Sequence, residues 1–285
     1  MRRRILLLAA LVAIAAAVVA VRAAQPVITV PIALVHAHAH NDYEHDRPLL
    51  DALDHGFCSV EADIWLVDGQ LLVAHSRDAV RADRTLEALY LDPLRERVRR
   101  NGGRLYPLGP ECTLLIDVKS DAASTYAVLA SVLERYADIL TTFHGGTVDH
   151  RAILAIVSGN SAPSLMANEP VRYAALDGGL ADLSSNASPD LVPWVSIDWR
   201  KLFTWSGGST EMPDPEKRLL GQVVADAHRQ GRKLRFWDAP DTPAGWTVLW
   251  DAHVDLINTD DLAGLEHFLR EREGIRLPLP TTRAP

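Results

Sequence analysis

Two acidic side chains, Glu61 and Asp63, lie two positions apart within an otherwise apolar run, residues 59–67. Such a run predicts a strand, and side chains two apart on a strand point to the same face. Two carboxylates that face inward repel each other and are costly to bury. A hard divalent cation would offset that cost, because Mg²⁺ and Ca²⁺ prefer oxygen ligands. The alternative is an edge strand with both acids in water, which the apolar residues around them disfavour.

A second apolar run, residues 113–119, ends in Asp117 and Lys119. These two side chains again share a face of the predicted strand. Asp117 is therefore a candidate third carboxylate ligand of the same cation. Lys119 is a candidate for binding an anionic group such as a phosphate oxygen. The simpler alternative is an ion pair between the two side chains at the end of the strand.

Two histidines follow short strand patterns near these acids. His40 ends the first predicted strand, and His75 ends the short run 71–74. Imidazoles on both sides of a bound substrate can act as general base and general acid near neutral pH. His36 and His38 lie within the first strand itself, where we expect them to be hydrogen-bonded core or supporting groups.

An alternation of β-rich runs and helical patterns along the 285 residues must position these candidates. The β-rich runs are mostly continuous in hydrophobicity, which is typical of strands buried on both faces of a parallel sheet. The helical segments begin with polar caps or proline and end at glycine. About eight such units predict an α/β fold, a single (β/α)₈ TIM barrel over residues 32–275. The predicted strands cover residues 32–38, 59–67, 113–119, 153–158, 173–176, 192–199, 233–237 and 254–258.

The two ends of the chain differ from this pattern. Arginines at positions 2–4 precede an almost wholly apolar run over residues 6–21, so residues 1–24 predict a cleavable signal peptide. An uncleaved membrane anchor is the alternative, since the run is near the minimum length for spanning. Both predict an exported protein, which is secreted, periplasmic or held at the membrane by its N-terminus. Residues 276–285 are rich in proline and threonine and predict a flexible tail.

Charge and cysteine content exclude several classes of protein. The chain has 29 Lys and Arg against 37 Asp and Glu, a net charge of −8, so nucleic acid is not an expected partner. The two cysteines, Cys58 and Cys112, are too few for a disulfide-rich scaffold or a cysteine-rich zinc site. In an exported chain this pair could form a disulfide. Two separate buried thiols are the alternative.

The order of these motifs resembles the glycerophosphodiester phosphodiesterase-like and phosphatidylinositol phospholipase C-like superfamily. That superfamily has a histidine after its first strand, Glu-x-Asp on the second, an Asp-Gly turn and a second histidine, as in His40, Glu61-Ala62-Asp63, Asp68-Gly69 and His75 here. Asp117-Val118-Lys119 resembles its next acidic strand. Within the superfamily, His-Asn-Asp-Tyr at 40–43 and Phe-Trp-Asp-Ala-Pro at 236–240 are most similar to the altered inheritance of mitochondria protein 6 group. The resemblance covers roughly residues 33–262.

The resemblance implies a metal-dependent phosphoric diester hydrolase that acts on a glycerophosphodiester or phospholipid-type substrate. One Mg²⁺ or Ca²⁺ would be held by Glu61, Asp63 and Asp117. His40 and His75 would be the catalytic acid–base pair. The substrate would be bound by Asn41, Lys119 and Trp237.

The implied partner is a phosphodiester small molecule or a phospholipid head group. Contact with a membrane surface would come through that substrate or through an uncleaved anchor, and no protein partner is implied. The chain departs from the main glycerophosphodiesterase pattern in two places. His40 is followed by Asn-Asp rather than Arg-Gly, and the third metal ligand is Asp rather than Glu.

Two other functions are compatible with parts of the pattern. His36-x-His38-x-His40 resembles the His-x-His motif of zinc amidohydrolase barrels, which need further histidines on later strands. The later predicted strands here carry no histidine at their ends, but Ser158, Asp177, Asp198, Asp238 and Asp260. The second alternative is a non-catalytic barrel that binds a ligand. Phosphodiesterase activity that depends on Mg²⁺ or Ca²⁺ would distinguish the three.

Overall fold

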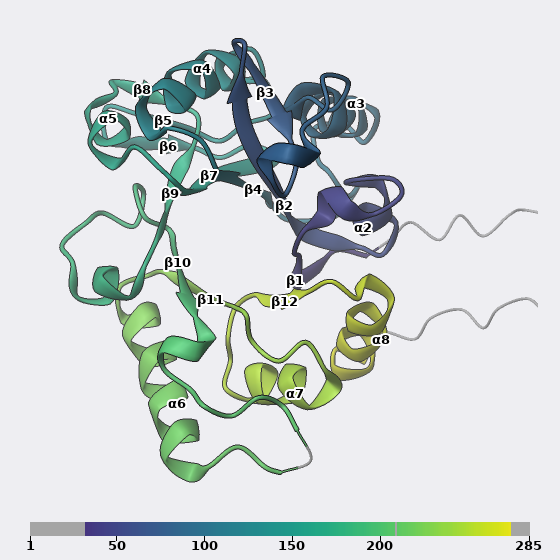
Figure 1. Ribbon diagram of the computed structural model, residues 1–285, viewed down its shortest axis with the longest axis vertical. Helices are drawn as coiled ribbons and strands as arrows, with labels where there is room; N and C mark the ends of the chain where they lie inside the picture. The colour runs from purple at the N-terminus through teal and green to yellow at the C-terminus, as the bar shows by residue number, and fades with distance from the viewer. Residues whose placement is uncertain (1–31, 209, 275–285) are drawn as a thin grey trace, which may run out of the picture. The chain divides into compact units, whose positions relative to one another are not determined.

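A computed structural model describes residues 32–208 and 210–274. Eight parallel strands stand side by side in the order β11-β10-β9-β7-β4-β2-β1-β12. The two end strands meet where the amide of Leu256 donates to the carbonyl of Leu234 at 3.2 Å, so the barrel is nearly closed (Figure 1). The strands are β1 (Leu34–Ala39), β2 (Phe57–Val67), β4 (Cys112–Val118), β7 (Ile153–Gly159), β9 (Ala175–Gly178), β10 (Trp194–Asp198), β11 (Lys233–Trp237) and β12 (Ile257–Thr259).

The predicted parallel α/β barrel is thereby confirmed, and each of the eight predicted strands overlaps one barrel strand. The predicted signal peptide or anchor, residues 1–24, lies outside the described residues, as does the predicted tail, residues 276–285. In the described part of the chain, no helix combines the length and apolarity that crossing a membrane requires.

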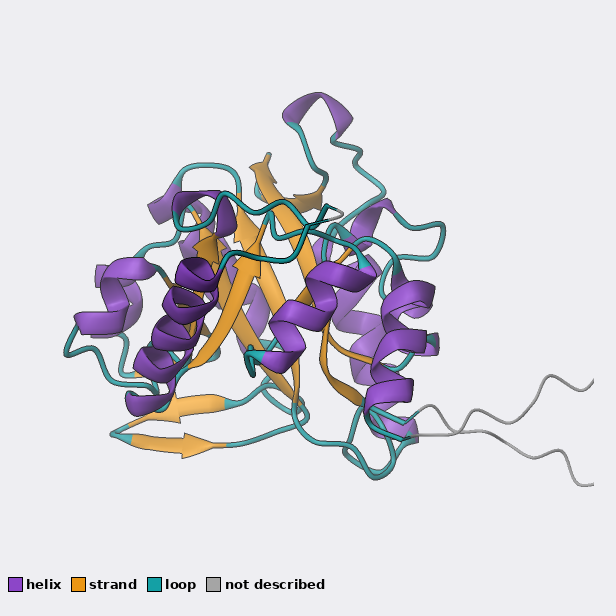
Figure 2. Cartoon of the chain, turned by 90° about the horizontal axis from the view of Figure 1, so that it is seen from below, coloured by secondary structure: helices purple, strands orange, loops and turns teal. Residues whose placement is uncertain are grey.

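Helices pack around the outside of the strands (Figures 1 and 2). Their apolar sides are buried; α6, for example, buries Leu220, Val223, Val224 and Ala227. Side-chain caps begin three of them, because Asp121, Thr242 and Asp261 each accept a hydrogen bond from a backbone amide of the first turn. The α-helices are α2 (Leu50–Asp54), α3 (Asp92–Arg100), α4 (Ala122–Glu134), α5 (Pro163–Asn168), α6 (Asp214–Arg229), α7 (Pro243–Asp251) and α8 (Leu262–Arg272). Short helical turns are η1 (Asp42–Glu44), η2 (Arg77–Ala79), η3 (Glu87–Leu91), η4 (Leu180–Ser184) and η5 (Trp199–Lys201).

One hairpin rises from the barrel. β2 pairs with β4 as far as Ile64, and its last residues pair antiparallel with β3 (Gln70–Val73). Asp68 and Gly69 form the turn between them with φ values of 48° and 78°, and glycine tolerates such a left-handed backbone best. The hairpin returns the chain to the rim of the barrel and ends just before His75.

A small antiparallel sheet lies at the opposite end of the barrel. It consists of β5 (Thr142–His144), β6 (Thr147–Asp149) and β8 (Val171–Arg172). Figure 2 shows strands of this sheet crossing beneath the barrel. Phe143 from β5 belongs to one cluster of buried apolar side chains with Leu115, Ile156, Ala175 and Trp194 of the barrel strands and Leu256, which directly precedes β12. This cluster forms an apolar floor inside the barrel.

The side chains that point into the barrel change from apolar to polar directly above this floor. Side chains alternate between the two faces of a strand, so the residue two positions further along points the same way. Two positions beyond the floor residues stand five polar ones: Asp117, Ser158, Asp177, Ser196 and Asn258. Polar side chains therefore lie at the C-terminal end of the barrel, above the apolar floor, as expected for a site on this fold.

Cys58 and Cys112 form a disulfide with Cα atoms 4.7 Å apart. They precede Ser59 and Thr113, which are partners in the ladder between β2 and β4. The bond therefore joins two neighbouring strands at their N-terminal ends, away from the polar end of the barrel. Of the two states that the sequence left open, the structure has the disulfide.

Candidate active site

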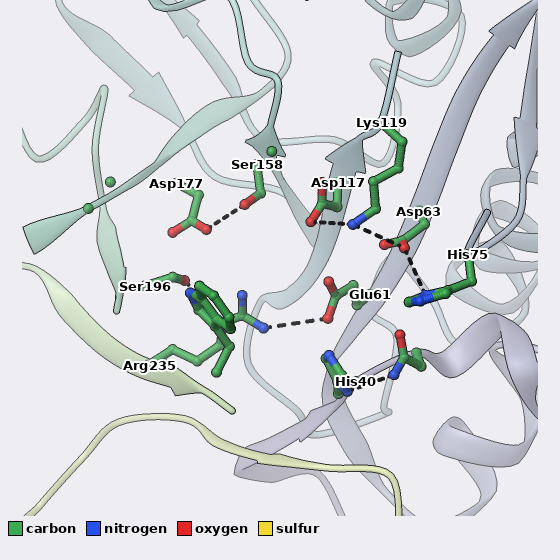
Figure 3. A pocket seen from close by; sticks show the side chains of 15 residues that line it. His40, Glu61, Asp63, His75, Asp117, Lys119, Ser158, Asp177, Ser196 and Arg235 are labelled. Carbon is green, nitrogen blue, oxygen red and sulfur yellow. Dashed lines mark hydrogen bonds and ion pairs between the residues drawn. The ribbon is translucent and has the colours of Figure 1, made fainter. Parts of the chain in front are cut away.

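A cleft of about 460 Å³ opens at the C-terminal ends of the strands (Figure 3). All eight residues predicted from the sequence line it: His40, Asn41, Glu61, Asp63, His75, Asp117, Lys119 and Trp237. The structure thus brings together residues that lie on β2, β4 and β11 or directly after β1, β4 and the hairpin. Their roles in binding and catalysis stay predictions.

The three carboxylates converge within the cleft. Glu61 and Asp63 lie on β2, and Asp117 lies directly opposite Asp63 in the ladder between β2 and β4. One potential ligand atom of each lies within 4.8 Å of those of the other two. Oδ1 of Asp63 and Oδ1 of Asp117 are both buried and have no hydrogen-bond partner. Three neighbouring carboxylates with buried oxygens that have no partner suit a hard divalent cation, so the donor set fits Mg²⁺ or Ca²⁺.

The pKa values of these acids and the charges around them also favour a bound cation. Burial and the charge of Glu61 raise the pKa of Asp63 to about 6, and burial also raises the pKa of Asp117. Lys119 offsets part of this repulsion, with Nζ 3.1 Å from Oδ2 of Asp63 and 3.0 Å from Oδ2 of Asp117. Burial opposes the charge of Lys119, but the two aspartates outweigh it and raise its pKa. Because Lys119 alone forms ion pairs with both aspartates, it cannot neutralise both, and a bound cation would neutralise the remaining negative charge.

Glu61 has a different environment, formed by His38 and Arg235. Burial opposes its ionisation, yet His38 and the Arg235 guanidinium together lower the pKa of Glu61 to about 2. Burial and the charge of Arg235 lower the pKa of His38 to about 4, so its ring is neutral at pH 7. Nε2 of His38 lies 3.4 Å from Oε2 of Glu61 and 2.9 Å from Nη1 of Arg235, and its Nδ1 lies 2.7 Å from Oγ of Ser59. Glu61 is therefore held as a carboxylate by groups beneath the cleft.

His40 is oriented by Asp260, which follows β12. Nδ1 of His40 donates to Oδ1 of Asp260 at 2.8 Å, and Nδ2 of Asn41 donates to the same oxygen at 3.4 Å. Burial would lower the pKa of His40, but the hydrogen bond to Asp260 and the charges of Glu61 and Asp260 together outweigh burial and raise it. The protonated imidazole is thereby favoured. This arrangement suits a group that gives a proton to a leaving oxygen.

His75 stands at the other side of the cleft and is more exposed. Its Nδ1 lies 3.0 Å from the hydroxyl of Tyr43 and 3.6 Å from Oδ2 of Asp63. The Tyr43 hydroxyl is also 2.8 Å from Oδ2 of Asp63 and 2.6 Å from Oδ1 of Asn41, two acceptors for its single proton. Tyr43 thus connects His75, a candidate metal ligand and Asn41 through one buried hydroxyl.

Several residues of the site were not among those predicted. Tyr43 lay within the recognised His-Asn-Asp-Tyr motif, and Asp260 was noted only as a strand-end acid. The others line the cleft from β7, β9, β10 and β11: Ser158, Gly159, Asp177, Gly178, Gly179, Ser196 and Arg235. Their positions at strand ends could have indicated them. Strand alternation predicts that a residue two positions beyond an inward-facing apolar residue also faces inward.

The three histidines of the first strand do not converge. His38 is buried against Ser59 and Arg235, and His36 instead meets the carbonyl of Asp255 at 2.9 Å and packs edge-on against Trp250 of α7. Both are hydrogen-bonded supporting groups, as expected. Within residues 32–208 and 210–274, Glu61, Asp63 and Asp117 are the one cluster of three or more potential metal ligands. The geometry therefore does not support a zinc amidohydrolase.

Solved structures share this barrel. One is a glycerophosphodiester phosphodiesterase from Agrobacterium tumefaciens, with a TM-score of 0.50 and 16% identity over 85% of this chain and 100% of that one. Another is a calcium-dependent phosphoinositol-specific phospholipase C from Pseudomonas sp., with a TM-score of 0.52 and 13% identity over 82% of this chain and 90% of that one. At these identities the likeness establishes the fold, which is the barrel of the glycerophosphodiesterase and phospholipase C-like class.

Sequence comparison identifies the family within this class. The family model for the AIM6-like phosphodiesterase domain matches residues 27–105. Altered inheritance of mitochondria protein 6 from Eremothecium gossypii is 31% identical, over 84% of this chain and 70% of that protein. The homologue from Arthroderma benhamiae is 26% identical, over 82% of this chain and 84% of its own length. The chain belongs to the altered inheritance of mitochondria protein 6 family.

Proposed function

We propose that the protein is a metal-dependent phosphoric diester hydrolase that acts on a glycerophosphodiester or a phospholipid-type head group. The observation that carries this proposal is the convergence of Glu61, Asp63 and Asp117, with two unpartnered carboxylate oxygens, beside Lys119 in one cleft. His40 and His75 line the same cleft. The phosphodiesterase-domain family and the shared barrel support the reaction class.

In this proposal, the three carboxylates hold one Mg²⁺ or Ca²⁺. The ion would act as a Lewis acid toward a phosphoryl oxygen. Lys119, the protonated side chain between Asp63 and Asp117, adds positive charge on the same side of the cleft. Asn41 and Trp237 contribute to the walls that hold the substrate, and Trp237 is 39% exposed at the end of β11.

Each of the two histidines carries out one proton transfer. His75 accepts a proton from water while the water oxygen forms a bond to phosphorus. His40, whose protonated form is favoured by Asp260, gives its proton to the oxygen of the leaving alcohol as the phosphorus–oxygen bond breaks. The products are a phosphomonoester and an alcohol. One proton enters at His75 and one leaves from His40, so a proton exchange with solvent resets the pair.

A metal-dependence assay tests this function. The purified chain is incubated with bis(4-nitrophenyl) phosphate and with glycerophosphodiesters, after chelation and then with Mg²⁺ or Ca²⁺ restored. We expect hydrolysis that chelation abolishes and one of the two ions restores. An Asp63→Asn, Asp117→Asn double variant serves as the matched control for a contaminating hydrolase. Hydrolysis that survives chelation, or none with either ion, would refute the proposal; in the second case a non-catalytic barrel would remain.

The proposed location is outside the cytoplasm, on the basis of the signal or anchor pattern of residues 1–24. Fractionation of cells that express the full chain, with mass determination of the recovered protein, tests it. A shortened chain in the exported fraction supports cleavage. A full-length chain in the membrane fraction supports the anchor, and a full-length chain in the cytosol contradicts both.

A further inference from the structure

One buried hydroxyl, that of Tyr43, lies between a candidate metal ligand and the proposed base. Its oxygen is 2.8 Å from Oδ2 of Asp63 and 2.6 Å from Oδ1 of Asn41. The same oxygen is 3.0 Å from Nδ1 of His75, whose side chain lines the cleft and is 63% exposed. The Tyr43 hydroxyl is therefore placed to control the hydrogen bonding of a ring that is otherwise open to solvent.

The direction of each of these hydrogen bonds follows from the number of protons. A phenol keeps its single proton near neutral pH, donates it to one partner and can accept from another. Asp63 and Asn41 both present oxygen acceptors to Tyr43, and hydrogen bonds to an ionised acceptor are the stronger ones. The proton of Tyr43 therefore goes to one of these oxygens. Nδ1 of His75 must then itself donate a proton to the Tyr43 oxygen.

A second contact of the His75 ring favours the same arrangement. Nδ1 of His75 lies 3.6 Å from Oδ2 of Asp63, an approach that Figure 3 marks with a dashed line. A lone pair on Nδ1 would be repelled by this carboxylate, whereas an N–H bond in its place is attracted to it. In a neutral imidazole one nitrogen carries the proton and the other is the acceptor. With the proton on Nδ1, the lone pair of His75 is on Nε2.

The backbone that carries Tyr43 is held from several sides. Tyr43 lies in η1, and Nη2 of Arg84 donates to its carbonyl oxygen at 2.5 Å. The neighbouring Asp42 is buried and accepts hydrogen bonds from the amide of Leu49 at 2.6 Å and from the hydroxyl of Tyr90 at 2.9 Å. The Tyr43 hydroxyl is thus fixed in place before a substrate binds, as a group that orients another side chain must be.

We propose that Tyr43 is a positioning residue that holds His75 in the tautomer with the proton on Nδ1 and the lone pair on Nε2. Nε2 accepts the proton of the attacking water, while the N–H bond at Nδ1 stays intact and still donates to the Tyr43 oxygen. The positive charge of the resulting imidazolium is stabilised by the nearby Asp63. This inference rests on the proposed function for the role of His75 as a base. The tautomer of the ring can nevertheless be measured without turnover.

Nitrogen NMR of the histidine rings tests the tautomer directly. The ¹⁵N-labelled chain is measured with Ca²⁺ at about pH 8, where an ordinary imidazole is neutral, and His75 is assigned as the ring that His75→Gln removes. In the wild type we expect a protonated Nδ1 and an unprotonated Nε2. In Tyr43→Phe the ring loses its fixed partner, so the proton should shift toward Nε2, which an unconstrained side chain favours in water. A protonated Nε2 in the wild type, or an unchanged ring in Tyr43→Phe, would overturn the proposal.

Kinetics then show whether the hydroxyl acts through His75. At saturating metal, Tyr43→Phe should lower kcat for bis(4-nitrophenyl) phosphate by about 10-fold or more and change KM by less than about 3-fold, because a misdirected base slows proton transfer rather than binding. The double variant Tyr43→Phe, His75→Ala should be no slower than His75→Ala alone, since residues that act as one unit are not additive. Losses that multiply in the double variant would overturn the proposal.

Tyr106→Phe is the matched control. The Tyr106 hydroxyl is buried and donates to the carbonyl of Phe57 at 2.7 Å, at the start of β2 and away from the cleft. The variant removes the same atom from a buried hydrogen bond, so it should cost stability but leave the His75 ring and kcat as in the wild type. A changed His75 tautomer in Tyr106→Phe would show that the ring responds to any lost hydroxyl, and it would overturn the specific role of Tyr43.

The two measurements separate this proposal from the proposed function. If the wild type has the expected tautomer, lost in Tyr43→Phe, but hydrolyses no phosphodiester with either ion, the hydrolase is overturned and the control of the ring by Tyr43 stands. If metal-dependent hydrolysis is found but the ring is protonated on Nε2, the hydrolase stands and the role of Tyr43 is overturned.

Discussion

Loss of the disulfide between Cys58 and Cys112 should cost a large part of the stability of the barrel. The two residues are 54 positions apart, and their Cα atoms are 4.7 Å apart in neighbouring strands. Closing a loop of that length in the unfolded chain corresponds to about 4 kcal/mol by the chain-entropy estimate. For a domain of this size, that free energy corresponds to a shift in Tm on the order of 10 °C.

Urea unfolding with and without reductant measures this contribution. The oxidised wild type should be more stable than the Cys58→Ala, Cys112→Ala double variant by about 4 kcal/mol. The reduced wild type should resemble the variant, which is itself unaffected by reductant and serves as the control. Metal affinity should change little, because six residue pairs from Ser59–Thr113 to Ile64–Val118 still hold β2 against β4. Two free thiols in the unfolded, unreduced wild type would refute the reasoning.

Three further predictions concern the site. Asp117→Asn should weaken Ca²⁺ or Mg²⁺ binding by roughly 10-fold or more, measured by calorimetry, because it removes one of three anionic ligands; unchanged affinity would place the ion elsewhere. His40→Ala and His75→Ala should each lower kcat on the order of 10²-fold while metal affinity changes little, and unaltered turnover in either would remove that residue from the mechanism. Asp260→Asn removes the partner that raises the pKa of His40. Because a general acid must be protonated, the loss of kcat/KM with rising pH should then begin at a lower pH, and a profile that does not move would contradict this role of Asp260.

The local pattern of the sequence was sufficient to predict the barrel strands, though not the small antiparallel sheet of β5, β6 and β8, and to predict the residues that carry the metal proposal. Alternation along a strand is set by backbone geometry, so Glu61 and Asp63 had to share a face whatever the rest of the chain did. The same argument applies to Asp117 and Lys119. Continuous apolar runs, caps and glycines then indicated a parallel barrel, whose polar end collects these residues.

Only the tertiary structure decided which distant residues meet them. Arg235 reaches His38 and Asp260 reaches His40 across separations of 197 and 220 residues. Both contacts depend on the pairing of β12 with β1 and on the closure that sets β11 beside β12. The pairing of Cys58 with Cys112 likewise depends on the register between β2 and β4. Strand alternation is a property of neighbours in the chain, whereas partners across a barrel are chosen by register and closure, which the packing of the whole core determines.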